Sequence, residues 1–214
     1  MSTTILLADD HTIVRQGLRA ILEAEGDFAV VGEVGDGRAA LEAARELAPE
    51  VVVMDIAMPG LNGIEATRRI ASSGGAPRVI VLSMYTDVEH VVHALRAGAA
   101  GYVRKDDADE ELVAAIRTGR PEHPFLSPSI DRRLVERHLR RSEPGGYEPL
   151  TAREREVLQL VAEGKLNKQI AALLGITVRT VEAHRARIME KLDLNDPAAL
   201  VRYAVRTGLV SPDH

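Results

Sequence analysis

Five polar residues with the chemistry of a cation site follow short apolar runs in the first half of the sequence. Asp9 and Asp10 end the run TTILLADD, and Asp55 ends VVVMD. A hydroxyl and an ammonium group, those of Ser83 and Lys105, end two later runs. Close carboxylates raise one another's pKa unless a cation lies between them, and Mg²⁺ prefers carboxylate oxygens as ligands. These residue types therefore predict a Mg²⁺ site, provided that the fold brings them together.

The elements that must position these residues alternate along the chain. Short runs rich in branched aliphatic residues are separated by stretches with apolar residues three and four positions apart. This alternation predicts βαβ units, and hence an α/β domain with a (βα)5 doubly wound parallel sheet. Functional groups in such a sheet collect at the carboxyl ends of the strands. The predicted strands are residues 3–9, 28–34, 51–55, 78–84 and 101–105.

The composition excludes several kinds of site. The chain of 214 residues has no cysteine, which excludes disulfides, thiolate nucleophiles and Cys-ligated metal centres. No apolar run approaches the ~18 residues that a membrane-spanning helix needs. The N-terminus has no basic region before a long apolar stretch, so it does not resemble a signal peptide. We therefore expect a cytoplasmic protein that does not engage a membrane.

The net charge of −5 is divided unevenly along the chain. Residues 1–120 contain 12 Lys/Arg and 19 Asp/Glu, a balance of −7, whereas residues 149–214 contain 10 and 8, a balance of +2. Residues 121–148 are rich in proline and glycine around one short amphipathic stretch. We predict two domains with different partners, residues 1–120 and 149–214, joined by a linker over residues 121–148 that contains one short helix.

The last segment has the caps and spacing of a helix-turn-helix. Thr151 and Glu154 match a capping box, and Thr177 can cap a later helix. Two helical stretches, residues 167–175 and 178–192, are joined by a short turn. In a helix-turn-helix the second helix enters the DNA major groove. A small all-α DNA-binding domain is therefore predicted, and a helical bundle that binds protein is the alternative because the charge is only +2.

Residues 3–119 resemble the receiver domains of two-component response regulators, which have a flavodoxin-like fold. Besides the five polar residues above, the resemblance rests on Met58-Pro59, Gly63 and Tyr102. It implies that Asp55 is the phosphoacceptor. The phosphoryl group would come from a phosphohistidine of a sensor histidine kinase or from a small acyl phosphate.

The same resemblance implies a ligand set for Mg²⁺. Asp10, Asp55 and the backbone carbonyl of Ala57 would ligate the ion, and Asp9 would act through water. The expected chemistry is phosphoacceptance, with at most slow Mg²⁺-dependent autophosphorylation and autodephosphorylation, and no enzyme with turnover is predicted. A haloacid-dehalogenase-like phosphatase is the enzymatic alternative, but it needs a second acid where this chain has Ala57.

Three residues around the phosphoacceptor are expected to respond to phosphorylation. Lys105 would pair with one phosphoryl oxygen, and Ser83 would donate a hydrogen bond to another. Tyr102 would turn inward when Ser83 moves. Outside this group, His90 and His93 lie one helical turn apart and could bind a metal, although a solvated helix face is the favoured interpretation.

Residues 149–212 resemble LuxR-type DNA-binding domains of the NarL/FixJ class of regulators. Two positions depart from the family pattern. Leu166 stands where the family usually has Ser or Thr, and Glu182 stands where many members carry Lys. An acid favours cytosine N4, so Glu182 leaves the target DNA sequence open. The resemblance rests on Leu150-Thr151-x-Arg153-Glu154-x-Glu156-Val157-Leu158, Gly164, Asn167-Lys168-x-Ile170-Ala171, Thr180-Val181-x-x-His184 and Lys191-Leu192.

The expected DNA contacts divide into two kinds. Basic side chains would bind mainly phosphates, which sets register and affinity, whereas small or acidic side chains would meet base edges. His184 could touch a phosphate or pack at the base of the helix. The expected phosphate contacts are Lys168, Arg179, Arg185 and Arg187, and the expected base contacts are Glu182, Ala183 and Ala186.

Together these features predict a transcriptional regulator that is controlled by phosphorylation. Phosphorylation of Asp55 would free or dimerise the helical domain, and a homodimer would place paired recognition helices on a two-fold operator in double-stranded DNA. The last helix, over residues 196–207, is the predicted dimer contact. RNA polymerase is a further candidate partner, and regulation of a protein partner instead of a promoter remains the alternative output.

Overall fold

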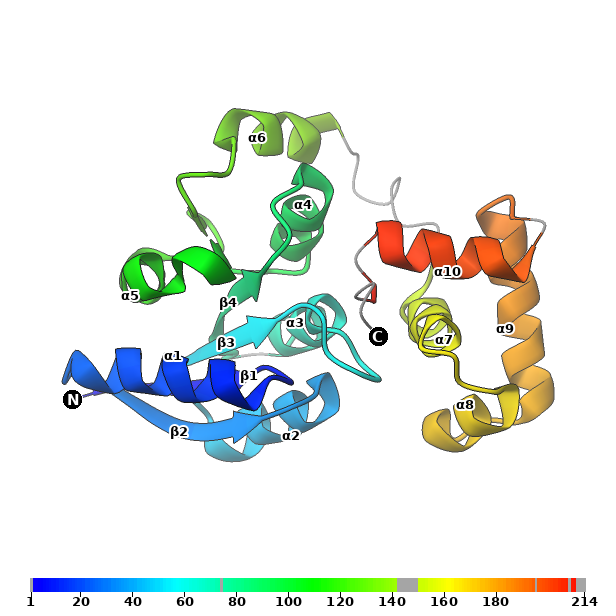
Figure 1. The fold of residues 1–214 in the computed structure, drawn as a ribbon, viewed down its shortest axis with the longest axis horizontal. Coiled ribbons are helices and arrows are strands. Elements are labelled where there is room, and N and C mark those ends of the chain that lie inside the picture. Colours follow the sequence, from blue (N-terminus) through cyan, green and yellow to red (C-terminus); the bar gives the residue numbers. More distant parts are fainter. Residues whose placement is uncertain (1, 74, 142–149, 195, 208, 211–214) are drawn as a thin grey trace. The chain divides into compact units, whose positions relative to one another are not determined.

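The computed structural model describes residues 2–73, 75–141, 150–194, 196–207 and 209–210 (Figure 1). The chain forms two compact units, Met1–Leu139 and Arg140–His214. None of the helices in the described ranges is long and apolar enough to cross a membrane. The two units are considered separately below.

The first unit is built on a six-stranded parallel sheet with the order β2-β1-β3-β4-β5-β6. This is the predicted α/β arrangement, extended by one strand. The strands are β1 (Thr3–Ala8), β2 (Phe28–Val34), β3 (Val51–Asp55), β4 (Arg78–Ser83), β5 (Gly101–Arg104) and β6 (Phe125–Leu126). The helices are α1 (Thr12–Ala24), α2 (Gly37–Leu47), α3 (Gly63–Ala71), α4 (Val88–Arg96), α5 (Ala108–Thr118) and α6 (Arg132–Arg141), with a short 3₁₀ helix, η1 (Lys105–Asp107).

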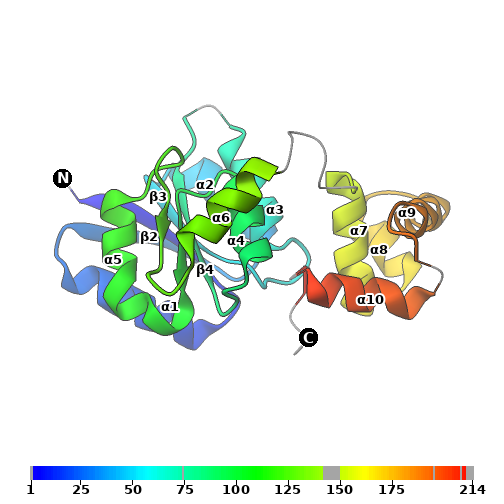
Figure 2. The same cartoon turned by 90° about the horizontal axis from the view of Figure 1, so that it is seen from above.

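Helices cover both faces of the sheet (Figure 2). Alternate residues of a strand point to opposite faces, so β3 sends Val52 and Met54 into the core beneath α2, α3 and α4. Val51 and Val53 enter the core beneath α1 and α5. Every residue of β3 is buried. This explains why the strand has a continuous apolar run, since a parallel strand covered on two faces has no side open to solvent.

The segment after residue 120 packs on the first unit. Phe125 and Leu126 pair with β5 as the sixth strand, and Ile130 and Val135 are buried in the core that α4 also enters. Arg96 of α4 donates a hydrogen bond to a carbonyl of α6, that of His138. The expected linker thus supplies a strand and a packed helix to the first unit. This strand could not be predicted from the sequence pattern, because two residues are too few to show an alternation of apolar and polar side chains.

From residue 150 onward, the described part of the second unit forms four helices around one aliphatic core. Thr151 caps α7 in the predicted capping box, in which its backbone N–H donates to Glu154 Oε2 at 2.7 Å and its hydroxyl accepts from Glu154 N–H. Thr177 caps α9. Gly175 adopts a φ of +64° in the turn between α8 and α9, a conformation that favours glycine. The helices are α7 (Ala152–Ala162), α8 (Asn167–Leu174), α9 (Val178–Lys191) and α10 (Pro197–Arg206).

Candidate functional site

The strand order brings the predicted polar residues to one edge of the sheet. β1, β3, β4 and β5 are consecutive parallel neighbours. Asp9 follows β1 directly, Asp55 ends β3 and Ser83 ends β4. Lys105 follows β5 as the first residue of η1. We call Asp9, Asp10, His11, Asp55 and Lys105 the acidic site.

Lys105 links two of the carboxylates. Its Nζ lies 2.8 Å from Oδ2 of Asp9 and 2.8 Å from Oδ2 of Asp55. Asp9 and Asp55 are almost fully buried, with 1% and 2% of their surfaces exposed. A buried charge is costly unless it is paired, so this shared ammonium group lets both carboxylates lie below the surface.

Burial and neighbouring charges set the protonation of the pair. Burial, supported by the charges of Asp9 and Asp10, raises the pKa of Asp55 although Lys105 opposes the shift. Burial pulls the pKa of Lys105 down, but the carboxylates of Asp55 and Asp9 outweigh burial, so the pKa of Lys105 is raised. When Asp9, Asp10, Asp55 and Lys105 are ionised and His11 is neutral, three carboxylates face one ammonium group. The site then has an excess of negative charge.

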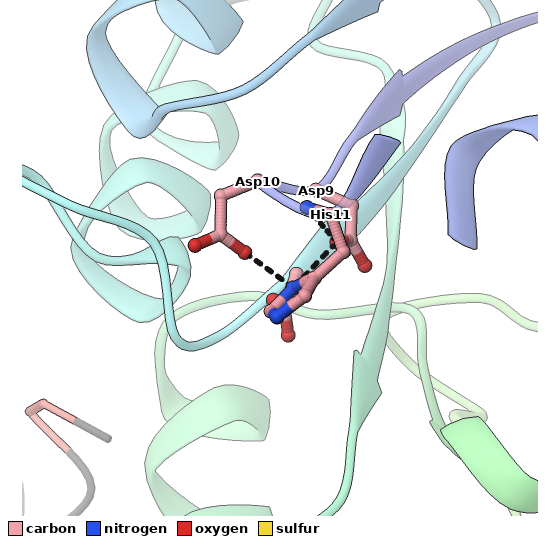
Figure 3. Close-up of side chains that lie close together, drawn as sticks. Asp9, Asp10 and His11 are labelled. Atoms are coloured by element: carbon pink, nitrogen blue, oxygen red, sulfur yellow. Dashed lines mark hydrogen bonds and ion pairs between the residues drawn. The ribbon is translucent and has the colours of Figure 1, made fainter. Parts of the chain in front are cut away.

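The same residues fit a divalent cation. Ligand atoms of Asp9, Asp10, His11 and Asp55 all lie within 4.8 Å of one another. Figure 3 shows the first three side chains converging, with His11 Nδ1 2.7 Å from Oδ1 of Asp10 and 3.3 Å from Oδ1 of Asp9. The prediction did not include His11, whose only signal is its place directly after the acidic pair. A donor set of carboxylate oxygens with excess negative charge suits Mg²⁺.

Gly63 allows α3 to begin directly against the end of β3. The Gly63 N–H donates to the carbonyl of Ile56 at 2.9 Å, and Asn62 caps the helix by accepting from Glu65 N–H at 2.8 Å. A Cβ on residue 63 would lie 1.8 Å from the carbonyl oxygen of Asp55. Only glycine therefore fits here, and the close approach holds the backbone that carries Asp55. Ala57 lies half-buried in the loop between these elements.

Ser83 and Tyr102 are both inside the protein. The Ser83 Oγ accepts a hydrogen bond from the backbone N–H of Tyr85 at 3.0 Å. Tyr102 is 0% exposed and its hydroxyl donates to the carbonyl of Tyr85 at 2.7 Å. Burial raises the pKa of the Tyr102 hydroxyl well above its usual value. Tyr102 is therefore buried in this structure, and its inward turn when Ser83 moves stays a prediction.

One face of α9 is exposed. Its members are spaced by three and four residues and have their side chains in solvent, whereas Val181 and Ile188 lie in the core of the second unit. Lys168 on α8 is exposed as well. We call Arg179, Glu182, Ala183, Ala186 and Arg187 the recognition face.

Arg185 and His184, two predicted DNA contacts, are less exposed than the recognition face. Arg185 is half-buried, and its Nη1 donates to Asn167 Oδ1 at 2.9 Å, which ties α9 to α8. His184 is half-buried, and its Nδ1 has no hydrogen-bond partner among the described residues. The sequence pattern places both residues on the second helix, and the structure separates them from the exposed stripe, Arg185 through its bond to α8 and both through their partial burial.

Comparisons with known proteins assign both units. Residues 5–117 match the response regulator receiver domain, and residues 148–204 match the bacterial regulatory proteins of the luxR family. The chain belongs to the response regulators with a LuxR-type DNA-binding domain. It is similar to the transcriptional regulatory protein LiaR of Bacillus subtilis (strain 168), with 41% identity over 97% of this chain and 99% of the relative. The oxygen regulatory protein NreC of Staphylococcus carnosus (strain TM300) is 38% identical over 96% and 98%.

Solved structures of response regulators are similar over nearly the whole chain. RcsB from Salmonella enterica serovar Typhimurium, bound to promoter rprA in the presence of the phosphomimetic BeF₃⁻, is 30% identical. The match covers 95% of this chain and 98% of that chain, with a TM-score of 0.64. The family, the receiver fold and the DNA-binding unit are thus confirmed, and this response regulator is a transcriptional regulator.

Leu166, one of the two departures from the family pattern, lies at the start of α8. Leu166 occupies the N-cap of α8 and is 69% exposed. It has no side-chain oxygen to cap the helix, so only Gln169 Oε1 contributes, by accepting from the Leu166 N–H at 2.8 Å.

The interpretation of His90 as part of a solvated helix face is wrong, because His90 is only 3% exposed. His93 is half-buried.

Proposed function

We propose that phosphorylation of Asp55 switches this response regulator. The supporting observation is the pair formed by the buried Asp55 carboxylate and Lys105 Nζ at 2.8 Å, at a rim that also holds Asp9 and Asp10. An oxygen of Asp55 attacks the phosphorus of a sensor-kinase phosphohistidine or of an acyl phosphate. A P–O bond forms, the bond from phosphorus to the donor breaks, and the donor leaves with the bonding electron pair.

We infer that Asp10, Asp55 and the Ala57 carbonyl hold Mg²⁺, with Asp9 bonded through water. When bound, this ion neutralises charge on the transferring phosphoryl group. Lys105 releases its contact with the Asp55 oxygen and pairs with a phosphoryl oxygen. Ala57 can neither protonate the leaving group of an external phosphate ester nor take a proton from water. The phosphorylated state is therefore hydrolysed slowly, and no turnover of an external substrate follows.

Ser83 carries the signal away from the site. Its hydroxyl now accepts from the Tyr85 N–H, and a phosphoryl oxygen offers the same hydroxyl an acceptor for its proton. Adding acceptor oxygens with negative charge is the usual way in which phosphorylation orders a neighbouring loop. Tyr102 is bonded to the same loop residue, so its position depends on the loop.

The output is binding to double-stranded DNA through α9. The exposure of the recognition face supports this role. Arg179 and Arg187, with Lys168, bind phosphates, and Arg185 joins them after it exchanges Asn167 for phosphate. Glu182, Ala183 and Ala186 meet base edges. His184 lies beside this face. A homodimer that contacts through α10 would present two such helices to a two-fold operator, and RNA polymerase is a further partner in the cytoplasm.

The test compares the wild type with Asp55→Asn and with Asp109→Asn, which alters an exposed acid of α5. Each is incubated with Mg²⁺ and acetyl phosphate, and its intact mass, oligomer size and binding to genomic DNA fragments are measured at one salt concentration. We expect one phosphoryl group, a dimer and stronger DNA binding for the wild type and Asp109→Asn only. Equal phosphorylation of Asp55→Asn would contradict the proposed acceptor. Capture of no DNA fragment in either state would favour a protein partner.

A further inference from the structure

His90 is a buried histidine that the proposed chemistry does not use. It lies in the first turn of α4, where Asp87 is the N-cap. Its Nδ1 is 2.5 Å from Asp87 Oδ2, and its backbone N–H donates to Asp87 Oδ1. The imidazole stacks on the ring of Tyr85, with centroids 4.8 Å apart and planes inclined by 10°. The histidine is thus fixed on one side by the cap and on the other by an aromatic ring.

Tyr85 connects His90 to both switch residues. Its backbone N–H donates to Ser83 Oγ at 3.0 Å, and its carbonyl accepts from the Tyr102 hydroxyl at 2.7 Å. The Tyr102 ring is 0% exposed, so this hydroxyl needs a protein acceptor in place of water. The position of the Tyr85 backbone therefore helps to hold Tyr102 inside.

The stacked position leaves one polar atom of His90 without a partner. Nε2 is buried, and no hydrogen-bond partner for it lies in the described ranges. A buried polar atom that is left unsatisfied costs free energy. The ring keeps this position despite the cost, which indicates that its contacts with Tyr85 and Asp87 matter more than full satisfaction of its own nitrogens.

We propose that His90 is a positioning residue of the switch: its ring stacks on Tyr85, fixes the carbonyl that accepts from Tyr102, and so keeps Tyr102 inward before phosphorylation. The link to phosphorylation rests on the proposed function, whereas the position of Tyr102 can be measured without it. If Tyr102 is already inward, a larger fraction of the receiver is in the conformation that binds the phosphoryl group or its analogue. The apparent dissociation constant for that group is then lower.

The first measurement follows Tyr102 directly. The chain has four tyrosines and no tryptophan, so ring-labelled tyrosine gives a simple ¹H–¹³C spectrum, in which Tyr102→Phe identifies the Tyr102 signal. Spectra of the full chain are recorded without phosphodonor for the wild type, His90→Ala, His90→Phe and His93→Ala. His90→Phe keeps an aromatic ring for stacking, and His93→Ala makes the same truncation one turn further along α4. Circular dichroism checks that each variant is folded.

We expect the Tyr102 signal to shift or split in His90→Ala and to remain at the wild-type position in His90→Phe and His93→Ala. The second measurement is the affinity for BeF₃⁻ in the presence of Mg²⁺, which we expect to be about tenfold weaker in His90→Ala and within about twofold of wild type in the other two. An unchanged Tyr102 signal in His90→Ala, or failure of His90→Phe to restore it, overturns the proposal. If wild type itself does not bind BeF₃⁻, the proposed function fails, and the Tyr102 spectra still decide the role of His90.

Discussion

The acidic site and the recognition face place their functional groups in opposite environments. Asp9 and Asp55 are nearly inaccessible and are held by Lys105 at 2.8 Å, whereas Arg179 and Arg187 lie in solvent. A group that acts on a bond must be held rigidly before the reaction, because misplacement weakens charge stabilisation. A group that binds DNA phosphates acts through charge, which tolerates movement and is screened by salt. Substitutions at the acidic site should therefore reduce phosphorylation more than substitutions on the recognition face reduce DNA binding.

The largest difference is expected for Gly63→Ala. The new Cβ would lie 1.8 Å from the Asp55 carbonyl oxygen, so backbone must move and Asp55 moves with it. We expect the free energy of unfolding of the first unit to fall by about 3 kcal/mol and phosphoryl incorporation from acetyl phosphate to fall by more than about tenfold. Urea unfolding and intact mass measure these effects. Gly17→Ala in α1 is the control, since nothing lies within 4 Å of its Cβ position, and it should stabilise by about 0.5–1 kcal/mol.

Lys105→Ala should separate metal binding from chemistry. Loss of the ammonium group removes charge stabilisation from the phosphoryl group, so we expect phosphorylation to slow by roughly 10²-fold. The same loss leaves more negative charge beside the metal ligands, so Mg²⁺ should bind more tightly. Phosphorylation rates at saturating Mg²⁺ and a Mg²⁺ titration measure the two effects. Weaker Mg²⁺ binding in this variant would contradict the charge balance derived for the acidic site.

On the DNA-binding unit, Arg187→Ala and Arg185→Ala should differ although they are two positions apart. Arg187 is exposed, so its loss should weaken DNA binding by roughly tenfold and reduce the slope of log K against log salt by about 1, without changing stability. Arg185 bonds to Asn167, so its loss should also lower the melting temperature of the unit. A salt titration and thermal unfolding measure both. An unchanged salt slope for Arg187→Ala would remove it from the phosphate contacts.

A smaller effect is expected for Asp55→Asn on stability without Mg²⁺. The folded state raises the pKa of Asp55, so it binds a proton more tightly than the unfolded state does. Wild-type stability then falls as pH rises from the unfolded pKa through the raised folded pKa. Asparagine does not ionise, so the variant should gain on the order of 1 kcal/mol over wild type at neutral pH and lose this advantage near pH 4. Urea unfolding at several pH values tests the sign, and Mg²⁺ should stabilise wild type more than the variant.

Leu166→Thr should produce the smallest change, and it should be a gain. A threonine hydroxyl at the N-cap of α8 would accept from a free backbone N–H. It would thereby complete the capping box, of which Gln169 already provides the other half. We expect the second unit to become more stable by about 0.5–1 kcal/mol. Leu173→Thr, at another exposed leucine of α8, has no cap to restore and serves as the control. Equal effects of the two substitutions would exclude capping as the cause.

The sequence alone was sufficient for the parts of this protein that depend on local pattern. Strand and helix periods and the caps at Thr151 and Thr177 follow from short-range sterics and hydrogen bonding, so they can be read from neighbouring residues. Gly63 was expected only from the resemblance to receiver domains, and its close approach to Asp55 is seen only in the structure. The convergence of Asp9, Asp55 and Lys105 was also predictable, because the carboxyl ends of parallel strands meet at one rim.

Only the tertiary structure decided which side chains those patterns bury or pair. The spacing of His90 and His93 favoured a solvated helix face, yet His90 is buried and stacks on Tyr85. Arg185 belongs to the same helix as the recognition face, and its bond to Asn167 removes it from that exposed stripe. β6 has two residues, too few to show a period. Each of these outcomes depends on a partner that is distant in sequence or on a segment too short to carry a pattern, so packing against other elements determines it.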